Sequence, residues 1–347
     1  MAPIGFTAVA GIFSTMYSFR VRHKLARGAG PAIRRLNDAL GNFDKVAWLL
    51  GDARSGTTWV ADLIARACGY YQLFEPFHPL KVPAFADWPL NHFQLPGSSN
   101  PPLRAALQQA FEVKLPSRRV NPVPDRLFYR GLLVKDVFAN LLAAWALKEF
   151  PLVRPILLIR NPFAVAVSKQ AKRHWLWTTG PVEMLRQAAL RASLAEEEID
   201  YLTSVEGRDD FILNQIAVWA LIHTVLLRQL RPGQVHLLIF EKVVADPREE
   251  IRKVSAFLGT EPAMTLLNPR QIGRPSRSSD QASVDRVRES RGGSWQSKIT
   301  PEQRRIGEDI LSRFGLDRFY RDGMPWISGA DPVRTGSPLQ EPEALCA

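Results

Sequence analysis

The sequence predicts a three-layer α/β/α fold around a central parallel sheet. Short, continuously apolar runs alternate with longer amphipathic segments, and Pro or Asn stands at the start of several of the amphipathic segments. Strands that are apolar throughout are typical of parallel sheets, because both of their faces are covered by helices. The chain has 347 residues, of which 46% are hydrophobic, so it can bury a core of this kind.

The elements are expected in a regular order. The first strand is "VAWLL" (46–50), and the amphipathic helix after it starts at the Ser/Gly/Thr turn of residues 55–58. Asn161 at the N-cap and Pro162 in the first turn favour a helix directly after the strand "PILLIR". Other strands are expected at "GLLVKD" and "VHLLIF", and other helices at "PLRAALQQAF", "VFANLLAAWALKEF", 182–203, 211–231, "PREEIRKVSAFLG" and "TPEQRRIGEDILSRFG".

The segments between these elements suggest the domain organisation. A Pro-rich stretch over 74–130 is expected to be a long insertion over the active-site face, because loops of this length are usually functional. We expect an N-terminal apolar and basic segment over 1–40, one catalytic domain over 41–326, and a disordered tail over 327–347.

The charge balance favours anionic ligands. Lys and Arg number 45 against 34 Asp and Glu, giving a net charge of +11, and a positive field attracts nucleotides, sulfated or phosphorylated substrates, nucleic acid and anionic membranes. The motif arginines lie at strand ends and loops rather than on one face, which argues against nucleic acid. Cys68 and Cys346 form neither a disulfide framework nor metal-ligand spacing, so we predict no metal.

The N-terminus contains no charge from residue 2 to residue 19 and then reads "RVRHKLAR". We rank a surface-lying amphipathic helix first, a weak membrane anchor second and a cleaved signal third. Peripheral membrane contact through residues 1–28 follows from the first choice. The expected location is the cytoplasm, with membrane association open, and a Golgi-type anchored lumenal enzyme is the alternative. The sequence leaves the oligomeric state unknown.

The segment "GDARSGTTW" (51–59) has the pattern of a phosphate-binding loop. Gly51 and Gly56 have the spacing of the first half of a P-loop, and the loop lies between a strand and a helix whose N-terminal amides attract anions. The lysine of a nucleotide hydrolase is missing; Arg54 supplies a cation, and Thr57 and Thr58 supply hydroxyls. This chemistry favours one phosphate or a phosphosulfate held without a metal, in a P-loop-like fold. The alternative is a Ser/Thr cap on a structural turn.

Four segments resemble sulfotransferases that use 3′-phosphoadenosine 5′-phosphosulfate (PAPS). "RSGTTW" resembles their 5′-phosphosulfate loop, and "PILLIRNPFAVAVSKQ" resembles their 3′-phosphate segment. "IFEKVVADPREEIRKVSAFLG" and "RGGSWQSKITPEQ" resemble two later blocks in the expected order. "LFEP", some twenty residues after the loop, is similar to the carbohydrate branch of the family.

The resemblance implies where PAPS binds. Arg160, at a strand end, and Ser168, on the following helix, are placed to clamp the 3′-phosphate by charge-assisted hydrogen bonds. Arg291 and Gly292 are a further anion candidate, and Glu241 is expected to orient the fold. The full set expected to bind the co-substrate is Arg54, Ser55, Gly56, Thr57, Thr58, Trp59, Arg160, Ser168, Arg291 and Gly292.

The resemblance also implies a general base. Glu75 in "LFEPFHP" is the first choice and His78 is the second, while Arg54 is expected to stabilise charge on the leaving group. The alternatives are a structural ion pair for Glu75 with a loop arginine and a surface histidine for His78. Trp175 and Trp177 are candidates for stacking on a sugar, with ordinary packing as the alternative.

The predicted activity is therefore metal-independent, in-line transfer of a sulfuryl group from PAPS to a hydroxyl of a carbohydrate or glycolipid. A P-loop kinase-like phosphotransferase is one alternative, although the Gly-Lys pair is missing. Sulfation of a lipid or a small-molecule alcohol is the other alternative.

Overall fold

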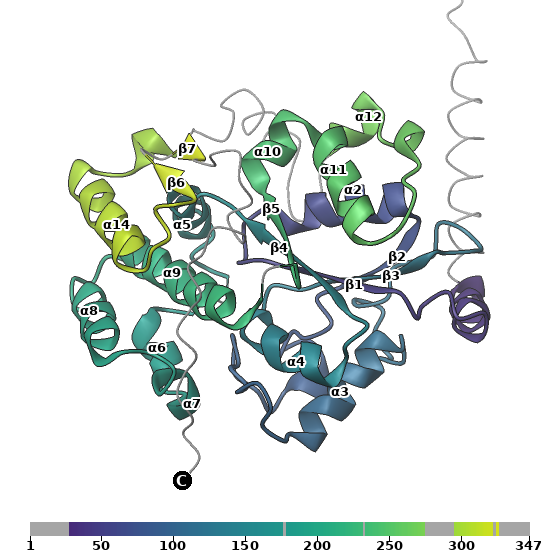
Figure 1. Ribbon diagram of the computed structural model, residues 1–347, viewed down its shortest axis with the longest axis horizontal. Coiled ribbons are helices and arrows are strands. Elements are labelled where there is room, and N and C mark those ends of the chain that lie inside the picture. The colour runs from purple at the N-terminus through teal and green to yellow at the C-terminus, as the bar shows by residue number, and fades with distance from the viewer. Residues whose placement is uncertain (1–27, 176–177, 232, 275–294, 322–323, 326–347) are drawn as a thin grey trace, which may run out of the picture.

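The predicted α/β/α fold is confirmed. The computed structural model describes residues 28–175, 178–231, 233–274, 295–321 and 324–325. Its five main strands form one parallel sheet in the order β2-β3-β1-β4-β5 (Figure 1). The strands are β1 (Val46–Leu50), β2 (Tyr70–Phe74), β3 (Gly131–Lys135), β4 (Arg154–Ile159) and β5 (His236–Ile239).

The sheet is buried on both faces because its central strands are apolar at almost every position. In β1, Ala47 and Leu49 belong to one core cluster, and Trp48 and Leu50 belong to the other. The Ala47 face is covered by helices that Figure 1 shows together above the sheet. These are α2 (Thr57–Cys68), α10 (Phe240–Ala245), α11 (Pro247–Phe257) and α12 (Pro269–Ile272).

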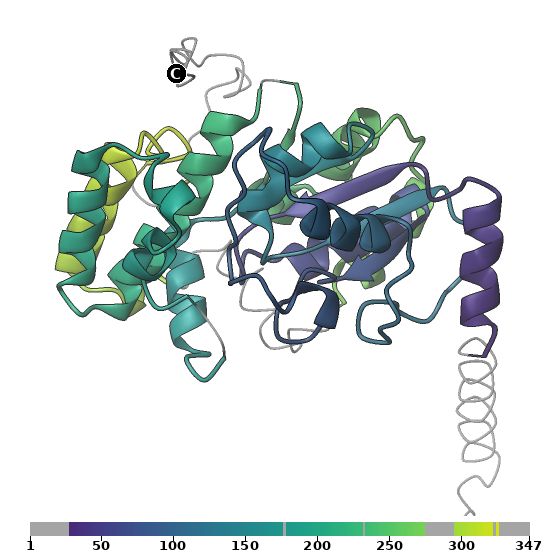
Figure 2. The same cartoon turned by 90° about the horizontal axis from the view of Figure 1, so that it is seen from below.

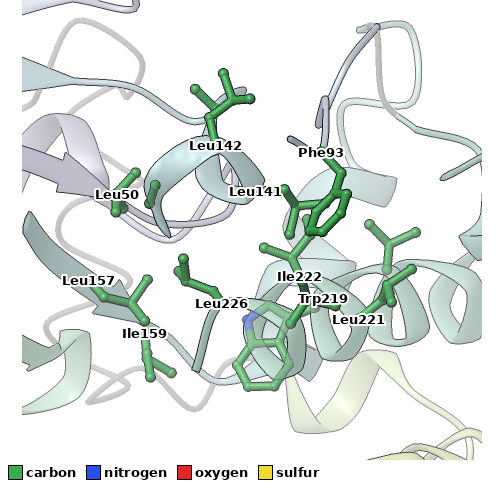
Figure 3. Close-up of a cluster of buried hydrophobic side chains, with 14 of the residues drawn as sticks. Leu50, Phe93, Leu141, Leu142, Leu157, Ile159, Trp219, Leu221, Ile222 and Leu226 are labelled. Atoms are coloured by element: carbon green, nitrogen blue, oxygen red, sulfur yellow. The ribbon is translucent and has the colours of Figure 1, made fainter. Parts of the chain in front are cut away.

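The opposite face carries the larger core. Helices α3 (Pro101–Phe111), α4 (Ala143–Glu149) and α9 (Phe211–Gln229) cover it. Figure 3 shows Leu157 and Ile159 of β4 facing Trp219 and Leu226 of α9 across this core. Trp219 and His223 are fully buried with their ring centres 4.1 Å apart, so both belong to this core.

Helix α9 is long and apolar enough to cross a membrane, and within the described ranges it is the only helix that meets this test. However, 78% of its most apolar window is buried inside the fold. It packs between α5 (Pro162–Gln170) and α14 (Pro301–Arg313), which Figure 2 shows from a second side. Helix α9 is therefore a core helix.

One expected helix is broken. Instead of a single helix over 182–203, the chain forms α6 (Pro181–Leu185), α7 (Ala188–Arg191) and α8 (Glu196–Glu206). Gln187 lies at the first break, where its side chain accepts a hydrogen bond from Phe93 N at 2.8 Å and donates one to Asn91 O at 3.1 Å. This tertiary contact, which spans almost 100 residues of sequence, outweighs the local helical pattern.

The expectations around the Pro-rich stretch need two corrections. Strand β2 was not predicted, and the helix expected from residue 137 begins only after a 3₁₀ turn, η2 (Asn140–Leu142). The stretch itself packs against a sheet face: Phe77 and Phe111 contact Trp48 of β1. The stretch also contains the 3₁₀ turn η1 (Pro83–Phe85).

The remaining elements are short. They are η3 (Met264–Leu266), η4 (Gln296–Lys298), β6 (Tyr320–Arg321) and β7 (Met324–Pro325), and residues 28–39 are also helical. The expectations for residues 1–27, for Trp177, for Arg291 and Gly292, and for the tail after Trp326 lie outside the described residues. They remain predictions.

Candidate active site

The carboxyl ends of the five parallel strands lie on one edge of the sheet, where ligands of open α/β sheets bind. From β1 the chain crosses to β2 on one side of the sheet, and from β3 it crosses to β4 on the other side of β1. The strand order therefore switches direction around β1. The residues at these strand ends are Gly51, Glu75, Lys135, Arg160 and Phe240. Three of these residues, Gly51, Glu75 and Arg160, were singled out from the sequence, and β3 and β5 add Lys135 and Phe240 at the same edge.

The phosphate-binding loop runs from Gly51 to Gly56, between β1 and α2. Its backbone has positive φ at Gly51 (153°), Arg54 (72°) and Gly56 (86°). Helix α2 starts without a side-chain cap, because Gly56 is its N-cap residue. Its first backbone N–H groups, together with the helix dipole, are thus directed to the loop, which is the arrangement that binds anions.

Gly56 is required for steric reasons as well as for its backbone conformation. A Cβ atom at this position would lie 2.2 Å from Cε2 of Phe240. Phe240 is the residue after β5, and its ring is buried beneath the loop. The predicted role of glycine in a tight turn is thus combined with close packing of the loop on β5.

The loop also contains a buried hydroxyl without a partner. The side chain of Ser55 is fully buried, and its Oγ has no hydrogen-bond partner among the described residues. Buried hydroxyls are normally satisfied, so a bound group is the simplest partner for this one. Thr57 and Thr58 are also buried next to it. Together they are suited to an anion that accepts several hydrogen bonds.

Arg54, Ser168 and Arg160 come together at this loop. Arg54 Nε donates to Ser168 Oγ at 3.0 Å, and Arg160 Nη1 donates to the backbone oxygen of Arg54 at 2.9 Å. The guanidinium group of Arg160 lies 4.4 Å from the centre of the Phe240 ring. Burial lowers the pKa of Arg160, and the nearby Glu241 opposes that shift. The predicted pair of Arg160 and Ser168 is therefore adjacent to the predicted loop.

Glu241 and Trp59 fix the segments around this region through hydrogen bonds. Glu241 accepts hydrogen bonds from Asn161 N at 3.1 Å and from the Tyr320 hydroxyl at 2.9 Å, as expected of a residue that orients the fold. Trp59 donates from Nε1 to the backbone oxygen of Ile272 at 3.0 Å. Trp59 thus connects α2 to the end of α12, and its predicted contact with the co-substrate remains a prediction.

Glu75 lies in a cluster of opposite charges. Its Oε1 accepts a hydrogen bond from Lys135 Nζ at 2.7 Å, and its Oε2 pairs with Arg119. Burial alone would raise the pKa of Glu75, but Lys135 and then Arg119 outweigh it and hold this pKa below its usual value of 4.5. The carboxylate is therefore ionised at neutral pH. The ion pair with a loop arginine, which was the alternative for Glu75, is present.

His78 has a different environment from Glu75. Its ring lies 4.3 Å from the ring of Phe138, and its Nδ1 accepts a hydrogen bond from Leu80 N at 3.3 Å. Burial, followed by the positive charge of Arg119, lowers the pKa of His78 to about 4. The imidazole is therefore neutral at pH 7. Its Nδ1, the nitrogen that carries the lone pair, already accepts the hydrogen bond from Leu80 N.

The segment after β3 joins the two parts of the site. Asn140 Oδ1 accepts from Gly51 N at 2.8 Å, which fixes the start of the phosphate loop. Asp136 accepts from Phe77 N at 2.9 Å, which fixes the segment that carries Glu75. Burial raises the pKa of Asp136 to about 7, against the effect of its backbone N–H donors. Sequence reasoning missed both residues, although the position of Asp136 directly after β3 was a usable signal.

Trp175, a candidate for stacking on a sugar, lies next to Arg54 of the loop. Its side chain is 40% exposed, and its ring centre lies 5.3 Å from the guanidinium carbon of Arg54. Trp295 is instead buried and stacks on Phe163, with ring centres 5.2 Å apart. Within the described ranges no group of three or more His, Cys, Asp or Glu side chains is arranged to hold a metal ion.

A family model described as "Sulfotransferase domain" matches residues 44–313. The chain belongs to the sulfotransferase family. This settles the class of enzyme: a PAPS-dependent sulfotransferase, as predicted, rather than a kinase-like phosphotransferase. No curated relative matches the sequence at a significant level.

Several solved sulfotransferases are similar to the chain at low sequence identity. The sulfotransferase from Alicyclobacillus acidocaldarius is 16% identical, with a TM-score of 0.39, over 78% of this chain and 93% of that one. The sulfotransferase domain of the curacin biosynthetic pathway is 17% identical, with a TM-score of 0.43, over 78% of this chain and 97% of that domain. A mouse sulfotransferase complexed with PAP is 14% identical, with a TM-score of 0.40, over 84% and 90%. The carbohydrate branch is not distinguished by these matches.

Proposed function

We propose that this sulfotransferase transfers the sulfuryl group of PAPS to a hydroxyl of a carbohydrate or glycolipid. The observation that supports the binding site best is that Arg54 of the loop, Arg160 at the end of β4 and Ser168 of α5 come together. Sulfation of a lipid or a small-molecule alcohol is the alternative, and the acceptor assay below includes it.

The two ends of the nucleotide have separate binding groups in this proposal. The 5′-phosphosulfate lies on the loop from Gly51 to Gly56, where Ser55 offers its unpartnered hydroxyl and α2 its N-terminal amides. The 3′-phosphate is bound by Arg160 and Ser168. Each end is thus bound by groups that carry positive charge or donate hydrogen bonds.

The transfer itself needs a base and a cation. The acceptor oxygen attacks sulfur as its proton passes to the Glu75 carboxylate; the bond from sulfur to the bridging oxygen breaks, and adenosine 3′,5′-bisphosphate leaves with the electron pair. Arg54 is the cation next to the loop and stabilises the charge that grows on the bridging oxygen. Lys135 and Arg119 keep Glu75 ionised, so the carboxylate is ready to accept the proton at neutral pH.

The exposure of the two cations beside Glu75 suggests the side from which the acceptor arrives. The side chain of Lys135 is 2% exposed, whereas that of Arg119 is 33% exposed. Arg119 is therefore the partner that can move aside when an acceptor hydroxyl approaches Oε2. It belongs to the Pro-rich stretch over 74–130, and Trp175 offers an exposed aromatic face next to Arg54 for a sugar ring.

The test compares Glu75→Gln with the matched variant His78→Gln. Labelled sulfate from PAPS is offered to a panel of glycans, glycolipids, lipids and simple alcohols in buffer with EDTA. We expect Glu75→Gln to lower kcat by about 10²- to 10⁴-fold, the usual contribution of a general base, and to leave PAP binding intact. His78→Gln should keep most of the activity.

Two results would contradict the proposal. Full activity in Glu75→Gln, with a loss in His78→Gln, would reverse the assignment of the base. Transfer confined to lipids or simple alcohols would refute the carbohydrate acceptor. Because the Glu75→Gln substitution leaves the buried Lys135 without a carboxylate partner, thermal melting with and without PAP is needed to separate lost catalysis from lost folding.

A further inference from the structure

A buried ion pair lies behind the phosphate-binding loop. Lys169 Nζ donates to both carboxylate oxygens of Asp52, at 2.7 and 2.9 Å. The two side chains are only 3% and 5% exposed. Asp52 is the second residue of the loop, and Lys169 follows Ser168 on α5. The pair therefore connects the segment proposed for the 5′-phosphosulfate with the helix proposed for the 3′-phosphate.

Two other contacts of the loop use groups that the nucleotide needs. Arg54 and Ser168 bond to each other, yet both are proposed to bind the co-substrate, so this bond competes with ligand binding. Arg160 is held through the backbone of Arg54 and is also proposed to bind a phosphate. Asp52 and Lys169 neutralise each other below the loop, and their contact need not change when a ligand arrives.

We propose that Asp52 and Lys169 are positioning residues: their ion pair fixes the spacing between the two phosphate-binding segments and so determines affinity for PAPS. The inference rests on the proposed function of those segments. It follows from the energetics of buried ion pairs, because desolvation offsets most of their attraction and an apolar pair of similar volume is often equally stable. A pair of this kind contributes more through the geometry it imposes than through stability.

The decisive variant replaces both partners, Asp52→Leu/Lys169→Met. It leaves no unpaired buried charge, so we expect a thermal midpoint close to that of the wild type. Without the tether the loop and α5 lose their fixed spacing, and we expect the dissociation constant for PAP to rise by at least about tenfold, since displacements near 1 Å have effects of this size or larger. Calorimetric titration with PAP measures the affinity, and scanning calorimetry measures the midpoint.

A matched control removes an exposed pair of the same type. Glu302 and Arg305 on α14 are 59% and 67% exposed, so Glu302→Gln/Arg305→Met should change neither the affinity nor the midpoint. Asp52→Asn is the second variant, in case the double variant does not fold. It keeps an oxygen acceptor for Lys169 but loses the charge, and we expect it to fold and to bind PAP several-fold more weakly.

The outcomes separate this inference from the proposed function. A wild-type protein that ignores PAP refutes the proposed binding site and the positioning role with it. If the wild type binds PAP and Asp52→Leu/Lys169→Met or Asp52→Asn binds it equally well, only the positioning role is refuted. A fall in the midpoint with unchanged affinity also refutes it, because the pair would then serve stability alone.

Discussion

Replacing Gly56 by alanine tests the packing of the phosphate-binding loop directly. The residue has φ of 86°, a conformation that costs a residue with a Cβ atom about 1–2 kcal/mol. The added Cβ would also lie 2.2 Å from Cε2 and 2.7 Å from Cδ2 of Phe240. Phe240 is 4% exposed, with Arg160 against its ring and Trp59 at its edge, so the ring has little space to move.

Overpacking of a buried side chain typically costs about 1–3 kcal/mol. The two contributions give an expected loss of about 2–5 kcal/mol in the free energy of unfolding for Gly56→Ala. If Phe240 shifts to relieve the overlap, Arg160 shifts with it, so affinity for PAP should fall as well. Urea denaturation measures the first effect, and calorimetric titration with PAP measures the second.

Gly259→Ala provides the matched control. Gly259 has φ of 61° after α11, and no atom of the residues that the structure describes lies within 4 Å of the position of an added Cβ. It should therefore show only the conformational cost of about 1–2 kcal/mol and no loss of PAP affinity. Adding Phe240→Leu to Gly56→Ala should recover part of the lost stability. If Gly56→Ala is no more destabilising than Gly259→Ala, the close packing of loop and β5 is refuted.

Three further predictions concern Glu75 and Asn140. Because the pKa of Glu75 lies below 4.5 in the folded protein, protonation of this base should lower kcat/KM only below about pH 4.5. An acid limb between about pH 6 and 7 that disappears in His78→Gln would refute this, since an unperturbed histidine titrates in that range. The pairing of Glu75 should likewise stabilise the fold above pH 4.5 and be lost as the pH falls through the lower folded-state pKa. Asn140→Ala removes the acceptor of the buried Gly51 N–H and should cost about 1–3 kcal/mol in urea denaturation, whereas an unchanged midpoint would show that this contact is dispensable.

The parts of the fold that could be predicted from the sequence depend on local patterns. Strands β1 and β4 are continuous apolar runs, and Asn161 caps α5 through Ala164 N at 3.1 Å as its position indicated. Strand β2, with the sequence "YYQLF", was missed because tyrosine and glutamine interrupt the apolar run at the edge of the sheet. The single helix expected over 182–203 does not form, because the Gln187 side chain is hydrogen-bonded to the backbone of Phe93. No local pattern in the sequence indicates this contact.

In the candidate site, too, the residues that could be predicted are those that belong to local motifs. Arg54 and the pair Arg160 and Ser168 stand in short motifs at strand ends, so their neighbourhood could be expected. Other contacts join residues far apart in the chain: 117 residues separate Asp52 from Lys169, and 89 separate Gly51 from Asn140. Such contacts depend on the order of the strands in the sheet, and no local pattern in a single sequence indicates that order.

Arginine in place of the loop lysine has a structural consequence that charge alone does not capture. The side chain of Arg54 presents nitrogens at fixed angles, and its Nε bonds to Ser168 while the guanidinium lies near the ring of Trp175. A lysine has a single terminal nitrogen and could not make the same set of contacts. Arg54 thus connects the loop to α5 from the ligand side, and Asp52 connects it from the buried side. The two connections differ in their relation to the ligand: in the proposed complex the Arg54–Ser168 bond opens because both groups bind PAPS, whereas the Asp52–Lys169 pair keeps the spacing of the loop and α5. Loss of the buried pair should therefore weaken the binding of both ends of the nucleotide.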